Sequence, residues 1–375
     1  MKAKGRKSEN PLARNSHLRC VPDHYSGCLL GGAVADALGA AAQGMSQNDI
    51  HEHFGPDGLR DYAKVFGREG AFTAHTQLVL FTAEGVLRAK VKAEELTLPL
   101  SIVPPVYNAY QRWLATQDGL CDASQYNGLG GGHLIQAPEL YQERHAEACC
   151  LEALTNGRLG QPELPINDSR GCGAAVRMAP LGLFFCSESI FRRLDPATID
   201  QTVFALGCQL AALTHGHPDA FLAAACQALL VFRLIRGDEL YDAVQNTLVV
   251  LGQYPRHEPC RNRLEDALIG VHDCESPGSA KCMSASQILA QAIRCALDAH
   301  GDFSRGVLAA VNLGGPSAGR SALAGQLLGA WLGRGTIPVS WLQRLELHDL
   351  ISEISDDLFV GFEPSGNWLE KYPGW

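Results

Sequence analysis

The stretch GAFTAHTQLVLF, residues 70–81, places a polar turn in front of an apolar helical run. The turn offers two hydroxyls and an imidazole, from Thr73, Thr76 and His75, but no carboxylate. Such a turn is typical of the mouth of a site, and histidine is the side chain whose charge changes most readily near neutral pH. We therefore expect Thr73, His75 and Thr76 to contact a ligand, with His75 as the candidate catalytic residue.

Two further stretches carry residues that could do chemistry. THGHP places His215 and His217 before a proline that can begin a helix. This pair invites a zinc interpretation, but zinc needs further ligands of known spacing, and no such set stands out, so no metal ligands are assigned. The alternative is that the histidines cap a helix end. In SRGCGAAVR, Cys172 has no base that the sequence assigns to it, so we do not expect it to act as a nucleophile.

The elements that must position these residues are helices. Apolar residues recur at helical spacing in nearly every segment, and several of these segments end at glycine, as helix C-caps do. Alternating β-branched runs are almost absent. The pattern predicts one all-α domain over residues 21–375, with long loops at residues 121–138, 155–171 and 252–283.

Composition excludes several classes of protein. The net charge of −9 argues against a nucleic-acid surface. The 13 cysteines are scattered through apolar runs without a CxxC pair, which indicates buried thiols in a reducing compartment, and we expect a cytoplasmic protein. No window holds 18 uninterrupted apolar residues, so no membrane partner is expected. Residues 1–20 form a basic, flexible tail, and an arm that docks on an acidic partner or an export signal are the alternatives.

Four segments, in this order, resemble the ADP-ribosylglycohydrolase family, which includes the dinitrogenase reductase-activating glycohydrolases. They are GCLLGGAVADALGAAAQGMS from residue 27, the stretch from residue 70, NDSRGCGAAVRMAPLGLFF with THGHPDAFLAA, and VNLGGPSAGRSALAGQLLGAWLG. Glycine- and alanine-rich helices are common, so each segment alone is weak, but together they span almost the whole domain. The resemblance implies a compact all-α orthogonal bundle with a central cleft.

The resemblance also implies a binuclear magnesium site, because members of this family remove ADP-ribose from modified side chains with two Mg²⁺ ions. Such ions need several carboxylates. The corresponding positions here hold Gln43, Ala74, His75, Pro316 and Ala318. Asp36 survives within a helical segment, where we expect a local structural hydrogen bond. We therefore expect no magnesium and no other cofactor.

Other residues match positions that contact the ligand in the family. Ser169, Gly171, Cys172 and Gly173 match a loop whose backbone N–H groups approach the diphosphate, although a plain helix-entry turn is the alternative. A place at the adenosine end of the cleft is implied for His215 and His217. Near the altered turn, Ser317 is expected at the ligand, and a cation from His75 or Arg320 would replace part of the Mg²⁺ charge, unless Arg320 faces solvent.

These observations predict a pseudoenzyme that binds ADP-ribose, a related nucleotide or an ADP-ribosylated protein without magnesium-dependent hydrolysis. A second interpretation is an immunity protein that blocks an ADP-ribosyltransferase toxin, with the basic tail in the toxin's cleft. A third is a secreted effector on the same scaffold. A fourth is a metal-independent hydrolase or lyase that uses His75.

Overall fold

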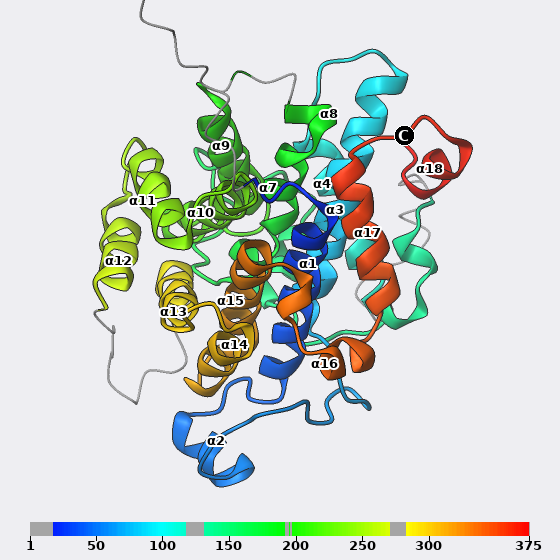
Figure 1. Cartoon of the computed structure of the whole chain (residues 1–375). Coiled ribbons are helices and arrows are strands. Elements are labelled where there is room, and N and C mark those ends of the chain that lie inside the picture. The colour runs from blue at the N-terminus through cyan, green and yellow to red at the C-terminus, as the bar shows by residue number, and fades with distance from the viewer. Residues whose placement is uncertain (1–17, 118–130, 192–194, 196, 271–282, 375) are drawn as a thin grey trace, which may run out of the picture.

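The computed structural model describes residues 18–117, 131–191, 195, 197–270 and 283–374, and over these residues the regular structure is helical. Within this part of the chain the β structure is an isolated bridge between Val65 and Arg68. The all-α prediction is confirmed (Figure 1). The helices are α1 (Pro22–Ala40), α2 (Gln47–Phe54), α3 (Ala74–Glu95), α4 (Val103–Ala115), α5 (Ala148–Thr155), α6 (Gly173–Val176), α7 (Ala179–Cys186), α8 (Glu188–Phe191), α9 (Ile199–Ala212), α10 (Pro218–Ile235), α11 (Leu240–Leu251), α12 (Glu258–Ile269), α13 (Ala285–Asp298), α14 (Phe303–Asn312), α15 (Ser317–Leu332), α16 (Val339–Arg344), α17 (His348–Val360) and α18 (Gly366–Lys371).

Helices α1 and α15 pack backbone against backbone along most of their length. A Cβ atom on Gly27 would lie 2.5 Å from the carbonyl oxygen of Gly329, and one on Gly31 would lie 2.6 Å from that of Gly325. Glycine is therefore required at these crossings, because a side chain would overlap the backbone of the other helix. The two helices run antiparallel, so the end of α1 and the start of α15 lie together, and Gly39 contacts Ala318.

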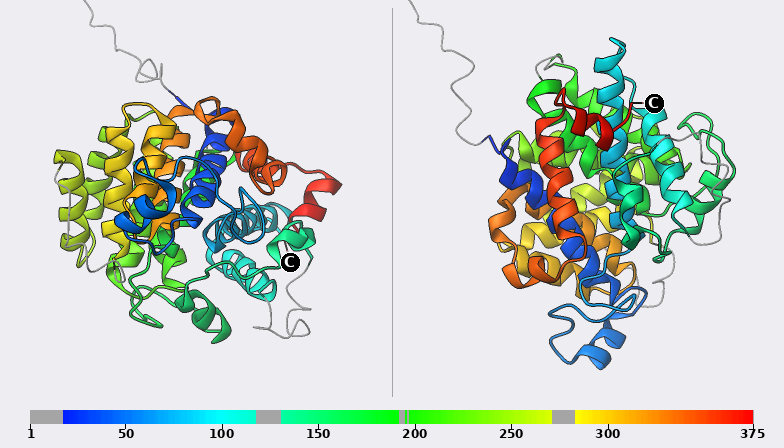
Figure 2. Two further views of the ribbon diagram at one scale, coloured as in Figure 1. Left: turned by 90° about the horizontal axis from the view of Figure 1, so that it is seen from below. Right: turned by 90° about the vertical axis from the view of Figure 1, so that its right-hand side faces the viewer.

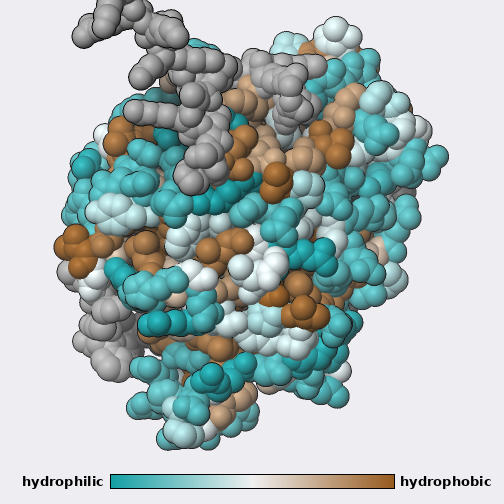
Figure 3. Space-filling view, in the orientation of Figure 1, coloured by the Kyte–Doolittle hydropathy of each residue, from teal (hydrophilic) through white to brown (hydrophobic). Residues whose placement is uncertain are grey.

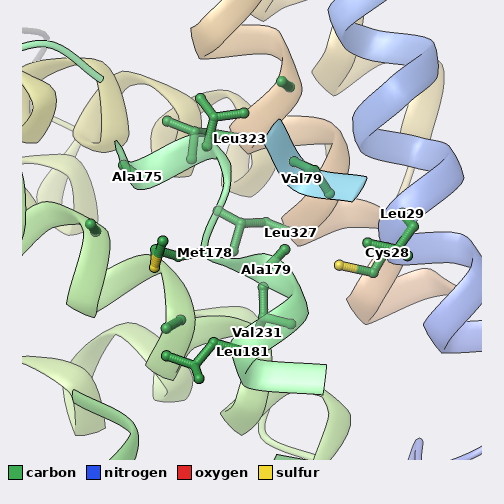
Figure 4. Close-up of a cluster of buried hydrophobic side chains, with 14 of the residues drawn as sticks. Cys28, Leu29, Val79, Ala175, Met178, Ala179, Leu181, Val231, Leu323 and Leu327 are labelled. Carbon is green, nitrogen blue, oxygen red and sulfur yellow. The ribbon is translucent and has the colours of Figure 1, made fainter. Parts of the chain in front are cut away.

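Helix α10 lies in the middle of the core. It is long and apolar enough to cross a membrane by length and composition, but 94% of that stretch is buried inside the protein, as in a core helix. Helices α7, α9, α13 and α15 pack around it. Figure 4 shows an apolar cluster to which α1, α3, α6, α7, α10 and α15 contribute, with the labelled side chains Cys28, Leu29, Val79, Ala175, Met178, Ala179, Leu181, Val231, Leu323 and Leu327.

The loop predictions are right in part. Residues 156–171 contain no helix, as expected, and short 3₁₀ turns at Leu134–Gln136 and Pro138–Leu140 lie at the end of the loop expected over residues 121–138. The prediction of a loop over residues 252–283 is wrong for Glu258–Ile269, which form α12. Proline at the second position and a left-handed glycine at the end, Gly270, delimit this helix. Parts of both regions, residues 118–130 and 271–282, lie outside the described residues.

Most of the expected basic tail, residues 1–17, also lies outside the described residues. Arg19, near its end, packs on the domain. Its guanidinium donates to the carbonyl of Leu234 in the last turn of α10, where a cation is favoured by the helix dipole, and to that of Asp238 in the turn that follows. On the face drawn in Figure 3, exposed apolar residues are interspersed among hydrophilic ones.

Candidate functional site

The end of the molecule where α1 finishes and α3 and α15 begin carries the candidate site. It lies beside the segment that leads to α2, at the lower end in Figure 1, and the left view of Figure 2 looks onto this end. Three segments that the sequence singled out therefore meet here: residues 43–46, residues 73–76 and residues 314–320.

Asp36 fixes the start of α3. Its carboxylate is fully buried and accepts hydrogen bonds from the backbone N–H of Thr73 and Thr76, both at 3.1 Å. It also accepts from their hydroxyls, at 2.7 and 2.6 Å. Asp36 thus has the expected structural role, but its hydrogen bonds join α1 to the start of α3 and are not local to its own helix. Since both hydroxyls donate to Asp36, Thr73 and Thr76 hold the turn in place and direct these protons away from any ligand.

Gln43 and Ala318, two of the altered acid positions, bind each other. The side-chain carbonyl of Gln43 accepts from the N–H of Ala318 at 2.9 Å, and Gln43 thereby caps the start of α15. Backbone hydrogen bonds join the same two segments, from Gly44 to Gly315 at 2.8 Å and from Gly315 to Met45 at 2.6 Å. The amide thus takes the place that the resemblance gives to an acid, and the turn is closed by its own polar groups.

Arg320 does not face solvent. Its side chain is 1% exposed, and its guanidinium donates to the carbonyls of Ala310 and Gly314 and to the side-chain oxygen of Gln291. These carbonyls belong to the C-terminal end of α14 and the turn after it, where a cation is stabilised by the helix dipole. Burial lowers the pKa of Arg320 to about 10. Ser317 is also buried, and its hydroxyl donates to the carbonyl of Val311 at 2.8 Å.

Glu147, which the sequence analysis did not identify, lies at the centre of the site. One oxygen of its carboxylate accepts from the N–H of Gly173 at 2.9 Å, and the other lies 2.7 Å from Nε2 of His215. A Cβ atom on Gly171 would come within 2.5 Å of this carboxylate. The glycines of the 169–173 loop therefore allow an anion to approach closely, and in this structure that anion is the carboxylate of Glu147.

The electrostatic environment keeps Glu147 ionised. Burial alone would raise its pKa, but the hydrogen bond with His215, the charges of His215 and His75 and the Gly173 N–H together lower the pKa to about 2. A quarter of the side chain is exposed, so the carboxylate is reached from solvent.

Two groups of metal-ligating side chains share Glu147. His75 and Cys172 form one, and Cys149, Cys150 and His215 form the other, and within each group the ligand atoms lie within 4.8 Å of one another. His75 is 9% exposed and Cys172 4%. A Cβ atom on Gly319 would meet both of them, which places this group against the start of α15.

The second group is held by a network around Thr214. The hydroxyl of Thr214 lies 2.7 Å from Nδ1 of His215 and accepts from the guanidinium of Arg177 at 2.7 Å. Cys149 Sγ lies 3.4 Å from Nε2 of His215. The interaction with Cys149 and the nearby charges of His215 and Arg177 lower the pKa of Cys150, while the same pair interaction and burial raise the pKa of Cys149.

His217 and Ser169 lie at the edge of the site. Nδ1 of His217 accepts from the N–H of Asp219 at 3.0 Å, so His217 caps α10. Burial lowers the pKa of His217, and the charges of Arg170 and Arg256 lower it further, against the carboxylates of Asp168 and Asp219. Both arginines are exposed, so their guanidinium groups are open to solvent at this edge, beside the carboxylates of Asp168 and Asp219.

The side chains at the five altered positions do not match magnesium. Mg²⁺ requires oxygen ligands, most often carboxylates. The oxygen of Gln43 is bonded to Ala318, Asp36 is saturated by the start of α3, and His75 faces Cys172. In the ligand groups found among the described residues, the carboxylate comes from Glu147, and its companions are imidazoles and thiols, which suit softer ions.

Sequence reasoning missed Glu147, Cys149 and Cys150. The sequence gives little indication that these residues form a site, because the side chains that face them come from residues 172–177 and 214–215, far along the chain. The two cysteines are adjacent in sequence, which is a poor arrangement for a simple disulfide, and both are free thiols in the structure.

Comparison with known proteins gives one consistent result. The sequence model of the ADP-ribosylglycohydrolase family matches residues 18–367. A solved structure described as "ADP-ribosylglycohydrolase-related protein complex" is 24% identical, with a TM-score of 0.61, and the alignment covers 91% of this chain and 99% of that one. At this identity the likeness concerns the fold alone. No curated protein sequence matches the chain.

Proposed function

Because the chain belongs to the ADP-ribosylglycohydrolase family, we propose that it is a member that recognises ADP-ribose, a related nucleotide or an ADP-ribosylated side chain without magnesium-dependent hydrolysis. The observation that carries this proposal is the mutual hydrogen bonding of the altered segments. Where the resemblance implies acids that hold Mg²⁺, the amide of Gln43 binds the N–H of Ala318.

Electrostatics support a position for the ligand that differs from the one implied by the resemblance. A diphosphate on the 169–173 loop would meet the ionised Glu147, and two anions in contact repel each other. Arg170 and Arg256 lie near His217 and are exposed. We therefore expect the phosphates at this edge, where guanidinium groups can form charge-assisted hydrogen bonds.

Calorimetric titration with ADP-ribose in magnesium-free buffer tests the proposal. Binding is expected, and replacement of either edge arginine, Arg170→Gln or Arg256→Gln, should weaken it. A charge-assisted hydrogen bond contributes about 1.5–3 kcal/mol, which corresponds to about 10- to 150-fold in affinity. Arg305→Gln is the matched control, since this exposed arginine lies in the first turn of α14, at the end away from Gly314.

Two outcomes would overturn the proposal. One is the lack of ADP-ribose binding at millimolar concentration, and co-elution with an ADP-ribosyltransferase would then favour a blocking protein. The other is magnesium-dependent release of ADP-ribose from a modified arginine. Binding that neither arginine variant changes would refute the position of the phosphates.

A further inference from the structure

We propose that Glu147, Cys149, Cys150 and His215 form a binding site for one divalent transition-metal ion, for which zinc is the best match. This inference does not rest on the proposed function, and it departs from the sequence expectation that no metal ligands are present. It concerns a kind of ion different from Mg²⁺, and residues outside the five altered acid positions.

The arrangement of ligand atoms is the first support. One oxygen, one nitrogen and two sulfur atoms lie within 4.8 Å of one another. Cys149 Sγ lies 3.4 Å from His215 Nε2 and 3.6 Å from the Glu147 carboxylate, and His215 Nε2 lies 2.7 Å from that carboxylate. With metal–ligand distances of about 2.0–2.3 Å, tetrahedral ligands lie about 3.3–3.8 Å apart. Shifts of about 1 Å or less therefore bring these four atoms to zinc geometry.

The fold positions the two halves of the group independently of a metal. Glu147 is the N-cap residue of α5, and both cysteines lie in the first turn of that helix. His215 lies between α9 and α10, in a turn that Asn167 fixes through the N–H of Gly216 and the carbonyl of Thr214. Rigid elements that present ligands in this way reduce the conformational entropy lost when an ion binds.

Contacts beyond the four ligands also suit a metal. Nδ1 of His215 lies 2.7 Å from the Thr214 hydroxyl, which leaves Nε2 to face the cysteines and Glu147. A histidine ligand typically donates its other ring N–H to such an oxygen, and this orients the ring. Since Cys149 and Glu147 are partly exposed, an ion can enter from solvent.

Charge balance favours a divalent ion. The buried guanidinium of Arg177 lies 3.7 Å from Cys150 Sγ. In the bound state, the charges of a divalent ion, two thiolates, the Glu147 carboxylate, a neutral His215 and the Arg177 guanidinium sum to zero. The uptake of the ion therefore leaves no uncompensated charge in a largely buried site, where such a charge would be costly.

Donor chemistry identifies the class of ion. Thiolate and imidazole ligands select zinc and similar borderline or soft ions, whereas magnesium and calcium require oxygen ligands. The other group around Glu147, His75 with Cys172, offers three ligands and lacks the paired sulfurs. We therefore assign the ion to the side of Glu147 that faces His215.

Titration of the full-length, metal-stripped and reduced protein with Zn²⁺ and Co²⁺ tests the proposal. Zinc affinity is measured by competition with a chromophoric chelator, and Co²⁺ reports ligands through thiolate charge-transfer absorption. We expect one tight equivalent of zinc and a cobalt spectrum typical of a tetrahedral site with two thiolates. Loss of a group that merely orients a metal ligand lowers metal affinity by about 10- to 100-fold. Cys149 and Cys150 are proposed to bind the ion directly, so Cys149→Ser and Cys150→Ser should each lower zinc affinity by at least about 100-fold.

Cys172→Ser is the matched control, because this buried thiol lies by the other oxygen of Glu147, where a serine hydroxyl can still donate, and zinc affinity should fall by less than about 10-fold. Circular dichroism and thermal unfolding of the metal-free variants establish that each is folded. The proposal is overturned if the parent protein binds zinc no more tightly than Cys149→Ser and Cys150→Ser, or if Cys172→Ser removes the tight site while they retain it. A separate variant, His215→Gln, should also lose the tight site.

Discussion

Replacement of Glu147 by glutamine tests the electrostatics at the centre of the site. The side chains have nearly the same shape, so the change removes the charge and leaves the packing in place. The carboxylate accepts from Gly173 and lies 2.7 Å from His215 Nε2. Its pKa is lowered from 4.5 to about 2, a difference of about 2.5 units at about 1.36 kcal/mol each. Allowing for the exposed quarter of the side chain, the charge stabilises the folded state by about 2–3 kcal/mol.

The sign of the pH dependence follows from the lowered pKa. Since the folded protein binds this proton less tightly than the unfolded chain, the stabilisation is fully present above the ordinary pKa near 4.5. It is lost as the pH falls through that value toward about 2. The glutamine variant cannot titrate, so the difference in unfolding free energy between parent and variant should shrink over the same interval.

Urea denaturation of the metal-free parent and Glu147→Gln proteins between pH 7 and pH 3 measures this difference. Other carboxylates titrate in both proteins and cancel in the comparison. We expect the parent to be more stable by about 2–3 kcal/mol at pH 7 and the gap to narrow steadily below about pH 4.5. A gap that stays constant down to pH 3 would refute the account of Glu147.

Two further predictions concern the contacts that position the site. Asp36→Asn should lower the free energy of unfolding by about 3–5 kcal/mol, because an amide cannot accept the four hydrogen bonds that the buried carboxylate accepts. Asp302→Asn, at the exposed cap of α14, should cost less than about 1 kcal/mol, and equal losses in denaturant unfolding would contradict the role of Asp36. Gly325→Ala should lower the melting temperature although alanine favours helices by about 1 kcal/mol, because its Cβ would overlap the carbonyl of Gly31. The control Gly366→Ala, with no atom within 4 Å of the added carbon, should leave the melting temperature unchanged or raise it. An unchanged melting temperature for Gly325→Ala would contradict the close crossing of α1 and α15.

Helical periodicity was sufficient to predict the fold class and the main helices. The apolar spacing after Thr73 predicts α3, whereas the close crossing of α1 and α15 at their glycines was not predicted and is seen in the structure. Helix α12 was missed because its sequence, EPCRNRLEDALI, is largely polar and buries few side chains. The helical periodicity of so short and polar a segment is weak, and the proline and glycine residues around it favour a loop more strongly.

The candidate site was predictable only where its residues lie in the recognised segments. The alteration at Gln43 is visible in the sequence, but its hydrogen bond to Ala318 depends on the antiparallel packing of α1 and α15. Arg320 was expected at a ligand or in solvent, and it caps the end of α14 instead. Glu147 lies outside the four segments, and its importance follows from the glycines and histidines that the fold brings to it.

The central claim is that this member of the family recognises its ligand without magnesium. The most direct measurement follows an arginine-ADP-ribosylated peptide with metal-free protein, without and with millimolar Mg²⁺, and records both peptide binding and the release of ADP-ribose. The account predicts binding that is unchanged by Mg²⁺ and no Mg²⁺-stimulated release. Release of ADP-ribose that begins when Mg²⁺ is added and stops when it is chelated would contradict it.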